Sequence, residues 1–501
     1  MLSALLARQG VASLVIEADP SYCTGSRAIC MSRRSQEILG WVGADVPLVD
    51  KGLSWVGGRS YYRGTEVLHF QMPTEPTERF APMVNIQQYF IEQFAHAAMQ
   101  PGDAAGDVRW GNRVTAVRPG ANAVAVDVET AHGVQTVRTD WLVACDGGRS
   151  TVREQLGLQL KGMQYDGRYV IVDIRQKTRR PVERLAWFDP PSNPGSTILM
   201  HRQPEDVWRI DYQIRDDEDS IEAVKPENVL PRVQSHLSMI GEDAPWEVLW
   251  ISIYNAKCLT LDTYRHGRVL FAGDAAHLVP IFGVRGLNSG LDDAGNLAWK
   301  LARVIQGRAP QGLLDSYSTE RVQAARENMA FGAKSTEFMA PPNFAFTLMR
   351  EAALRLALTD ASVRPLINPR QSAPIRYGDS ALNLASVPAA WANDLAAAGM
   401  PAPEARMADA SHLTRQFGAD FVCLVLAHDG AALDMRALQP LGIRAVHLSP
   451  ADAQAWQRYG LGQGVDQALV LVRPDGYVMG RWNTLDTGEL VTAIATSGAW
   501  A

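Results

Sequence analysis

The sequence has few cysteines, no long apolar run and no excess of positive charge. No apolar stretch approaches the ~20 residues that a membrane-spanning helix needs. The 48 Lys and Arg against 54 Asp and Glu give a formal net charge of −6, which excludes a globally basic nucleic-acid-binding protein. The cysteines are scattered, include no CxxC pair and indicate a reducing, cytoplasmic compartment without a disulfide framework, and we expect no metal site. They are Cys23, Cys30, Cys145, Cys258 and Cys423.

The composition that remains is typical of a large globular protein. The chain has 501 residues, of which 47% are apolar and 20% charged. At about 150 residues per domain, this length predicts roughly three domains. The apolar content is enough for a large core and excludes a disordered chain.

The start of the chain has the pattern of half a nucleotide-binding unit. Residues 2–9 predict the end of a helix, Gly10 closes it, and residues 11–16 predict a buried strand that ends at Glu17. Helix, strand and acid form the second half of a βαβ unit, whose Gly-rich turn precedes the acid by about 20 residues. That turn would precede Met1. We therefore expect either a true start further upstream or the loss of a central strand and its phosphate loop.

Further along the chain the periodicity changes several times. A helix is expected over 85–100, and alternation over 169–250 predicts an antiparallel sheet rich in aromatics. A parallel strand returns at 268–272, before a long helix over 288–304. The expected units are a nucleotide-binding domain, first part, N-terminally incomplete (1–165), a β-sheet substrate domain (166–255), the return of the first domain with long helices (256–360), a Pro-rich linker (361–400) and a C-terminal α/β unit (401–501).

The strongest motif is Gly273-Asp-Ala-Ala-His-Leu-Val-Pro280, which continues into Gly286-Leu-Asn288. An aspartate at a strand end, here Asp274, can accept hydrogen bonds from sugar or ribityl hydroxyls. The amides of residues 286–288 begin a helix and can donate to an anionic ligand atom, assisted by the helix dipole. The alternative is an ordinary strand-loop-helix connection with an N-cap. For the whole stretch we favour a ligand site.

This stretch closely resembles the second flavin motif of the single-component FAD-dependent aromatic hydroxylases, the p-hydroxybenzoate hydroxylase and phenol hydroxylase superfamily. Cys145-Asp-Gly-Gly-Arg-Ser-Thr-Val-Arg153 resembles the Asp-Gly motif of that family. The strand ending at Glu17, and Ser26-Arg-Ala followed by Gln87 at a helix start, are two further matches in the same order. The resemblance covers residues 1–350.

The C-terminal unit resembles the redox-inactive thioredoxin-like domain of the phenol hydroxylase and 3-(3-hydroxyphenyl)propionate hydroxylase branches. Its lack of CxxC agrees with a structural or dimer-contact role, so a homodimer is expected. The implied fold is α/β: a Rossmann-like FAD-binding domain with an inserted, mostly antiparallel β-sheet substrate domain and a C-terminal thioredoxin-like α/β domain.

The resemblance also implies cofactor-binding residues. Each has a structural alternative, such as a solvated strand end, a surface ion pair or a β-turn. Arg149 and Arg153 are further candidate phosphate partners. The implied roles are Glu17 at the adenosine ribose, Arg27 at the pyrophosphate, Gln87 at the ribityl or pyrophosphate region, Asp146 in a motif associated with FAD and the nicotinamide, Gly273 and Asp274 at the ribityl chain, Pro280 beside the isoalloxazine, and Gly286, Leu287 and Asn288 at the flavin N1/C2=O edge.

The implied reaction is hydroxylation of a phenolic substrate. NADH or NADPH reduces bound FAD, and O2 then forms a C4a-hydroperoxide that hydroxylates an electron-rich ring. Candidates for the substrate pocket are Trp187, His201, Arg209 and Tyr212, for which ordinary sheet packing is the competing interpretation. Arg285 would lie near the flavin or point to solvent.

Two alternatives to this function stay open. The first is a related flavin monooxygenase that acts on polyketide or antibiotic-type rings. The second is a truncated, non-catalytic remnant with weak or no FAD binding that acts as a contact module.

Overall fold

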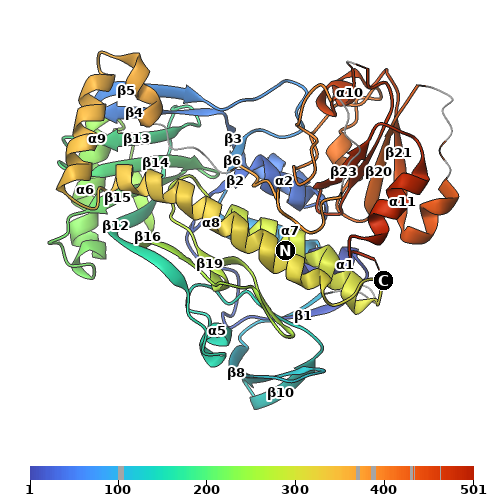
Figure 1. Ribbon diagram of the computed structural model, residues 1–501. Coiled ribbons are helices and arrows are strands. Elements are labelled where there is room, and N and C mark those ends of the chain that lie inside the picture. Colours follow the sequence, from blue (N-terminus) through green and yellow to red (C-terminus); the bar gives the residue numbers. More distant parts are fainter. Residues whose placement is uncertain are drawn as a thin grey trace.

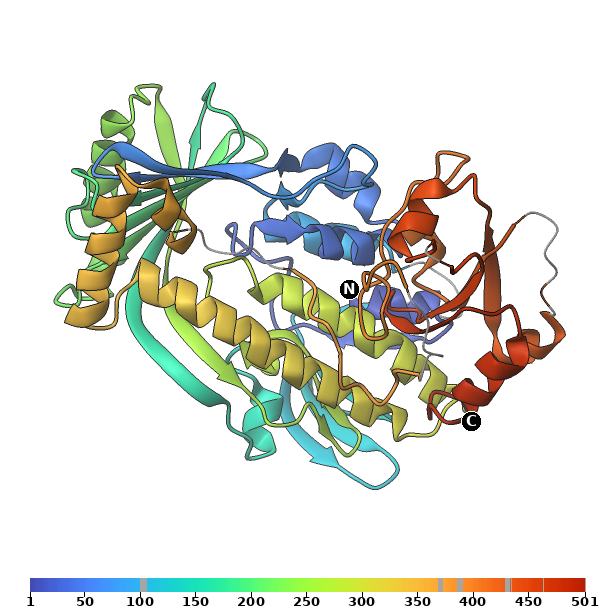
Figure 2. The same ribbon diagram turned by 45° about the horizontal axis from the view of Figure 1, so that its top comes forward.

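The computed structural model describes residues 1–99, 106–367, 373–384, 391–428, 433, 435–462 and 464–500. Residues 368–372 and 385–390 of the expected linker lie outside this part of the chain. Helix α8 (Leu313–Met339) runs diagonally through the molecule, with a large β-sheet at one end and the C-terminal unit at the other (Figure 1). Helix α7 (Gly286–Ile305) lies beside it (Figure 2).

The nucleotide-binding part contains two small parallel ladders. After α1 (Leu2–Arg8), β1 (Ser13–Ile16) pairs with β7 (Gly106–Arg109). Separately, β11 (Leu142–Ala144) pairs with β18 (Val269–Phe271), which also pairs with β17 (Arg265–His266). Among the described strands none joins these two ladders. The expected helix at 2–9, the strand before Glu17 and the returning strand before Gly273 are confirmed.

Several shorter elements complete this part. An antiparallel sheet of three strands has alternating burial on its middle strand, as its Val-x-Val pattern predicts. The helix expected over 85–100 is confirmed, with its ends at Gln88 and Ala97. The elements are β2 (Cys30–Ser32), α2 (Arg33–Gly40), α3 (Asp45–Lys51), β3 (Leu53–Trp55), β6 (Met83–Asn85), α4 (Gln88–Ala97), β8 (Arg113–Pro119), β9 (Val124–Thr130), β10 (Gly133–Thr139) and α5 (Thr151–Gln155).

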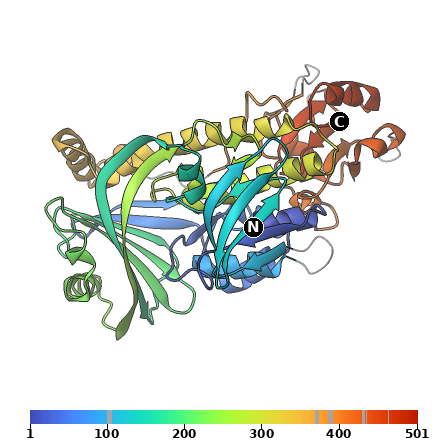
Figure 3. The ribbon, with the colours of Figure 1, turned by 90° about the horizontal axis from the view of Figure 1, so that it is seen from below.

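The large sheet has eight strands and curves around the molecule (Figure 3). Every neighbouring pair is antiparallel except β13 with β4, which agrees with the mostly antiparallel prediction. The hairpin β4–β5 comes from residues expected in the first domain, so the large sheet extends beyond the expected range of 166–255. In order across the sheet, the strands are β19 (His277–Leu278), β16 (Trp246–Thr260), β12 (Lys161–Gln176), β15 (Val207–Ile214), β14 (Thr197–Gln203), β13 (Arg184–Phe188), β4 (Gly57–Tyr62) and β5 (Thr65–Gln71).

The two faces of this sheet differ in chemistry. One face is apolar and packs against α6 (Pro226–Met239) through residues such as Trp208 and Val233. The opposite face carries the charged side chains of Arg184, Arg209 and Asp211, all buried. It packs toward the nucleotide-binding part, where Tyr169 and Phe282 lie edge to face with ring centroids 5.2 Å apart.

A buried histidine of α6, His236, makes the stability of this unit sensitive to acid. The ring centroids of His236 and Trp187 are 4.6 Å apart, and His236 Nδ1 lies 2.9 Å from Ser192 Oγ. Burial, with a contribution from Arg180, lowers the pKa of His236 from 6.5 to about 3. The unfolded chain therefore takes up the proton first, so stability is full above pH 6.5 and falls as the pH drops toward 3.

We expect this histidine to contribute a loss of about 1 kcal/mol for each pH unit below 6.5. His236→Gln should flatten the fall in the urea midpoint between pH 7 and pH 5. His69→Gln, at an exposed position on β5, is the matched control and should leave the profile unchanged. An unaltered profile in the His236 variant would show that other groups cause the acid sensitivity.

The C-terminal unit is a mixed four-stranded sheet in the order β21-β20-β22-β23. β20 is parallel to β21 and antiparallel to β22, and Cys423 lies buried on β20. Helix α9 (Phe344–Ala357) lies at the other end of the molecule, near β5 (Figure 1). The elements of the unit are β20 (Phe421–Leu426), β21 (Ile443–Leu448), α10 (Ala453–Arg458), β22 (Ala468–Val472), β23 (Val478–Trp482) and α11 (Thr487–Ala495).

No helix in the described ranges is both long and apolar enough to cross a membrane.

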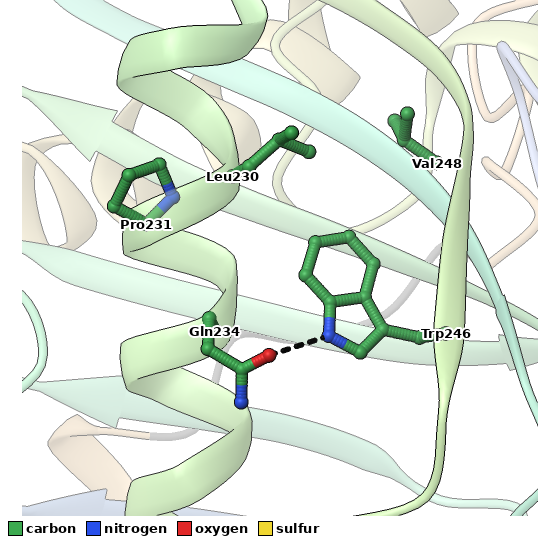
Figure 4. Close-up of a pocket in the computed structure, with 5 residues that line it drawn as sticks. All are labelled: Leu230, Pro231, Gln234, Trp246 and Val248. Carbon is green, nitrogen blue, oxygen red and sulfur yellow. Dashed lines mark hydrogen bonds between the residues drawn. The ribbon is translucent and has the colours of Figure 1, made fainter.

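A surface hollow lies between α6 and β16, where Trp246 Nε1 donates to Gln234 Oε1 at 2.8 Å (Figure 4). Trp246 packs with the apolar core under α6, so this hollow lies on the side of the sheet away from the charged face.

Candidate functional site

Asp293 of α7 holds the loop that follows β18 in place through hydrogen bonds. Gly273 has a φ of 60°, a left-handed conformation that favours glycine. Asp293 Oδ2 accepts the Gly273 amide at 2.9 Å and His277 Nε2 at 2.7 Å, and its Oδ1 accepts Arg321 Nε at 2.6 Å. Burial alone would raise the pKa of the Asp293 carboxyl group, but the larger combined effect of His277 and Arg321 lowers this pKa well below its usual range. The carboxylate therefore stays charged and keeps the loop shape.

On the loop that Asp293 holds, and at the start of α7, polar groups are available for a ligand. Asp274 is exposed, and its carboxylate makes no hydrogen bond to any residue that the structure describes. Helix α7 lacks a side-chain N-cap, so the amides of Gly286, Leu287 and Asn288 have no partner from a capping residue. A Cβ built on Gly273 or Gly286 would meet no atom within 4 Å, so both glycines border open space.

These groups fit the flavin part of FAD. An unpaired carboxylate can accept bonds from the ribityl hydroxyls, and an uncapped helix start can donate to the N1/C2=O edge, which becomes negative on reduction. Pro280 is buried against Gly332 of α8, where it can shape the turn beside the ring system.

The segments that contain Arg27 and Gln87 lie side by side. The Gln88 amide donates to the Ser26 carbonyl at 3.1 Å, and the Ile86 amide donates to the Ile29 carbonyl at 2.8 Å. Arg27 is exposed and has a φ of 46°, which is uncommon for a residue other than glycine. The buried Gln87 donates to the Pro204 carbonyl at 3.1 Å, and its Oε1 has no hydrogen-bond partner among the described residues.

Glu17 and Asp146 are placed at the ends of separate parallel strands. Glu17 follows β1, and its Oε1 accepts the Asp19 amide at 2.9 Å. Asp146 follows β11 and accepts the Val152 amide at 3.0 Å, so it helps to begin α5. Arg153 donates to the carbonyls of Ala275 at 3.0 Å and Gly148 at 2.6 Å, and so joins the Asp-Gly motif to the Asp274 loop. Arg149 is exposed.

The side chains of Arg285 and Asn288 make hydrogen bonds to neighbouring elements of the protein. Arg285 is 3% exposed and points toward α8, where its Nη1 donates to Asn328 Oδ1 at 2.7 Å. Burial lowers the pKa of Arg285 to about 10, so it stays a cation at neutral pH but does not point to solvent. Asn288 Oδ1 accepts the Ser32 amide at 2.9 Å, and its Nδ2 donates to the Cys30 carbonyl at 3.0 Å. The side chain thus ties α7 to β2, while its amide stays at the helix start.

On the charged face of the sheet, the Arg209 side chain also bonds to other residues of the protein. Its Nε donates to Asp211 at 2.8 Å, and its Nη1 donates to the carbonyl of Arg27. Asp173, one strand away, accepts Ser26 N and Oγ, each at 2.8 Å. These contacts fix the Arg27 segment to the sheet. Arg209 therefore positions the predicted pyrophosphate residue.

His201 lies on the same face, directly across from Arg209 and from Arg184 on the neighbouring strands. Burial and these two guanidinium groups hold the pKa of His201 well below 6.5, so it is neutral at pH 7. Tyr212 and Trp187 lie on the other face, in the core under α6. The structure thus brings His201 and Arg209 together but separates them from Tyr212 and Trp187.

Arg184 is a functional candidate that we did not predict from the sequence. It is 4% exposed and is the first residue of β13, directly before Leu185 of the core that faces α6. Because Arg184 follows Glu183 at the edge of the apolar stretch, the local sequence carries no signal that it is buried.

The comparisons with known proteins decide the family. Residues 1–332 match the family described as "FAD binding domain". The chain belongs to this family. A 3-(3-hydroxy-phenyl)propionate/3-hydroxycinnamic acid hydroxylase from Mycolicibacterium smegmatis is 27% identical over 401 residues, 77% of this chain and 68% of that protein. With three further mycobacterial hydroxylases of that name, the chain spans 61% to 68% of each relative's length. The predicted resemblance to the FAD-dependent aromatic hydroxylases is therefore confirmed.

Solved structures show the same fold. The flavin-dependent monooxygenase PieE, in complex with FAD and substrate, matches with a TM-score of 0.81 and 21% identity, covering 99% of this chain and 96% of that one. The anhydrotetracycline hydroxylase OxyS from Streptomyces rimosus matches with a TM-score of 0.73 and 26% identity, covering 100% and 97%. These likenesses confirm the α/β fold class.

Proposed function

We propose that this member of the FAD-binding family is a monooxygenase that hydroxylates a phenolic ring with NADH or NADPH and O2. The observation that carries the proposal is the unpaired Asp274 carboxylate beside the uncapped start of α7, on a loop that Asp293 holds in shape. FAD, when bound there, supplies the redox chemistry between the nicotinamide, oxygen and the ring.

The residues of the chain have separate tasks in this proposal. Asp274 and the amides of residues 286–288 bind the flavin, while Glu17, Arg27, Gln87 and Asp146 remain proposed contacts for the rest of FAD. Tyr169 of the sheet packs edge to face on Phe282 of the loop before α7, and this apolar contact would help to exclude water from the reacting atoms. The neutral His201 can accept a hydrogen bond from a phenol hydroxyl.

The decisive experiment scores product as well as cofactor consumption. The purified chain, incubated with FAD and passed through gel filtration, should keep a flavin absorption spectrum. A panel of phenols should then stimulate NADH or NADPH oxidation with formation of hydroxylated product. Polycyclic, polyketide-type phenols belong in the panel, because OxyS shares the whole fold. A colourless protein would contradict the proposal and favour a non-catalytic remnant, and peroxide release without product would contradict the hydroxylase reaction.

We further propose a cytoplasmic homodimer. All five cysteines are free thiols, which supports a reducing compartment. Helix α9 and the turn after it expose an apolar strip that a second copy could cover. Its members are Phe344, Leu348, Met349, Leu356 and Leu366.

A further inference from the structure

The loop between β18 and α7 is fastened to the large sheet along β16. Residues 277–278 of this loop form β19, which pairs with the end of β16 (Figure 1). The hydroxyl of Tyr254, earlier in β16, donates to the Val279 carbonyl at 3.3 Å. Residues 277–279 are therefore held against one strand of the sheet, in addition to the anchor that Asp293 of α7 provides.

A second tyrosine of the sheet holds the loop three residues further on. Tyr169 of β12 lies directly across from Tyr254 in the register between the two strands, so both side chains are on the same face of the sheet. The Tyr169 ring packs edge to face on Phe282, with ring centroids 5.2 Å apart. The two tyrosines thus hold both ends of the segment Val279–Phe282, which contains Pro280.

The turn around Pro280 is also confined by α8 and is strained. A Cβ built on Gly332 of α8 would lie 3.2 Å from Pro280 Cδ, so the helix and the proline are in close contact. Val284 has a φ of 54°, in the left-handed region that a β-branched residue rarely adopts. Such strain persists only where the surrounding structure enforces it. The contacts from the sheet and from α8 therefore hold the turn in a conformation that it would not adopt alone.

The Tyr254 hydroxyl lies close to the candidate flavin groups. Burial, and then the negative charge of Asp274, raises the pKa of Tyr254 well above 10, while the backbone of Ile281 has a smaller, opposite effect. The hydroxyl therefore stays protonated at neutral pH and remains a donor to Val279. It thus lies near the proposed ribityl residue Asp274 and bonds to the residue next to Pro280.

We propose that Tyr254 is a positioning residue, whose hydroxyl fixes the Pro280 turn and thereby the place of the isoalloxazine relative to the large sheet. This rests on the proposed function, because Asp274 and the start of α7 are the proposed flavin-binding groups. The bond joins a strand of the sheet to the flavin loop, so it helps to set the distance between the ring system and a substrate held by the sheet. A misplacement of about 1 Å is enough to lower a rate by about 100-fold.

The FAD-free chain provides the first test, through hydrogen exchange measured by mass spectrometry. Tyr254→Phe removes only the hydroxyl and keeps the ring on the sheet. We expect amide exchange in a peptide that covers residues 279–285 to become at least about fivefold faster, because one bond that holds the turn is lost. Tyr61→Phe is the matched control, since Tyr61 stacks on Trp187 on the opposite face of the same sheet. Unchanged exchange in Tyr254→Phe would overturn the proposal.

The FAD-loaded protein provides the second test. A ring that leaves the ~0.5 Å range of a precise site loses its fixed surroundings, so the visible circular dichroism of the bound flavin should fall at least about twofold in Tyr254→Phe. With the phenol that reacts best, kcat for product should fall about tenfold and KM should change less than about twofold, while more of the nicotinamide oxidation ends in peroxide. Tyr61→Phe should match the wild type in both measurements. Faster exchange with unchanged dichroism and unchanged product yield would show a merely structural bond and would reject the positioning role.

These outcomes are separable from that of the proposed function. If the wild type retains no flavin, the proposed function and the role of Tyr254 are both rejected. If it retains flavin but hydroxylates no phenol, the proposed reaction fails, while exchange and dichroism still decide the role of Tyr254. If product forms and Tyr254→Phe equals the wild type in every measurement, the reaction stands and the positioning role is rejected.

Discussion

Asp293→Asn should lower the free energy of unfolding by roughly 3–5 kcal/mol and abolish flavin retention. The wild-type carboxylate accepts three donors: the Gly273 amide, His277 and Arg321. The amide side chain has no charge to offset Arg321, which is 1% exposed, and its NH2 group would face donors. Loss of the anchor also releases the loop that presents Asp274.

Two measurements check this prediction. The free energy of unfolding from urea titration gives the stability change, and gel filtration with FAD gives flavin retention. Asp315→Asn is a suitable control, because Asp315 is 71% exposed on α8 and pairs with Arg265 at the surface. It should change neither measurement noticeably. If the Asp293 variant retains flavin with wild-type stability, the carboxylate does not hold the loop.

Strand alternation explains which parts of the site could be predicted from the sequence. Side chains on a strand alternate between faces, so residues three apart lie on opposite sides. Arg209 and Tyr212 are three apart on β15, and therefore could not both line one pocket. The same rule separates Trp187 from Arg184 on β13. Applied to our candidates, this rule alone shows that Arg209 and Tyr212 could not both be pocket residues, whereas placing His201 and Trp187 on a face also requires the register between the strands.

The Asp274 loop was predictable because its signals are local. A strand, a left-handed glycine and a helix start follow one another within Val269–Asn288, and each depends on neighbouring residues. Other features depend on contacts between distant segments. The β4–β5 hairpin joins the sheet through pairing of Arg184 with Gly58, and no local pattern indicates such a partner. Asp293 stood within the predicted helix, but its role depends on Arg321 of another helix.

The second large effect concerns the contact between α8 and the C-terminal unit. Glu320 is 1% exposed and accepts Lys300 Nζ at 2.8 Å, Asn296 Nδ2 at 2.6 Å and both Arg473 Nη atoms at 2.6 and 3.0 Å. Ser380, which lies in the segment of sequence that connects α9 to the C-terminal unit, donates to the same carboxylate at 2.5 Å. Burial raises the pKa of Glu320, but Arg473 and Lys300 outweigh it and hold the pKa well below its usual range.

Because Glu320 neutralises the buried Lys300 and joins it to Arg473, which keeps a second partner in Asp475, Glu320→Gln should cost roughly 3–5 kcal/mol and loosen the C-terminal unit from the helices. We expect urea unfolding to separate into two transitions and limited proteolysis to cut between residues 361 and 400. Glu327→Gln is the matched control two turns further along α8, where the glutamate accepts Gln323 at 2.9 Å. A single transition at the wild-type midpoint would show that the unit is held by its apolar contacts alone. Since α7 carries both Lys300 and Asp293, a loosened contact should also weaken flavin retention, which makes the C-terminal unit part of the support for the flavin site.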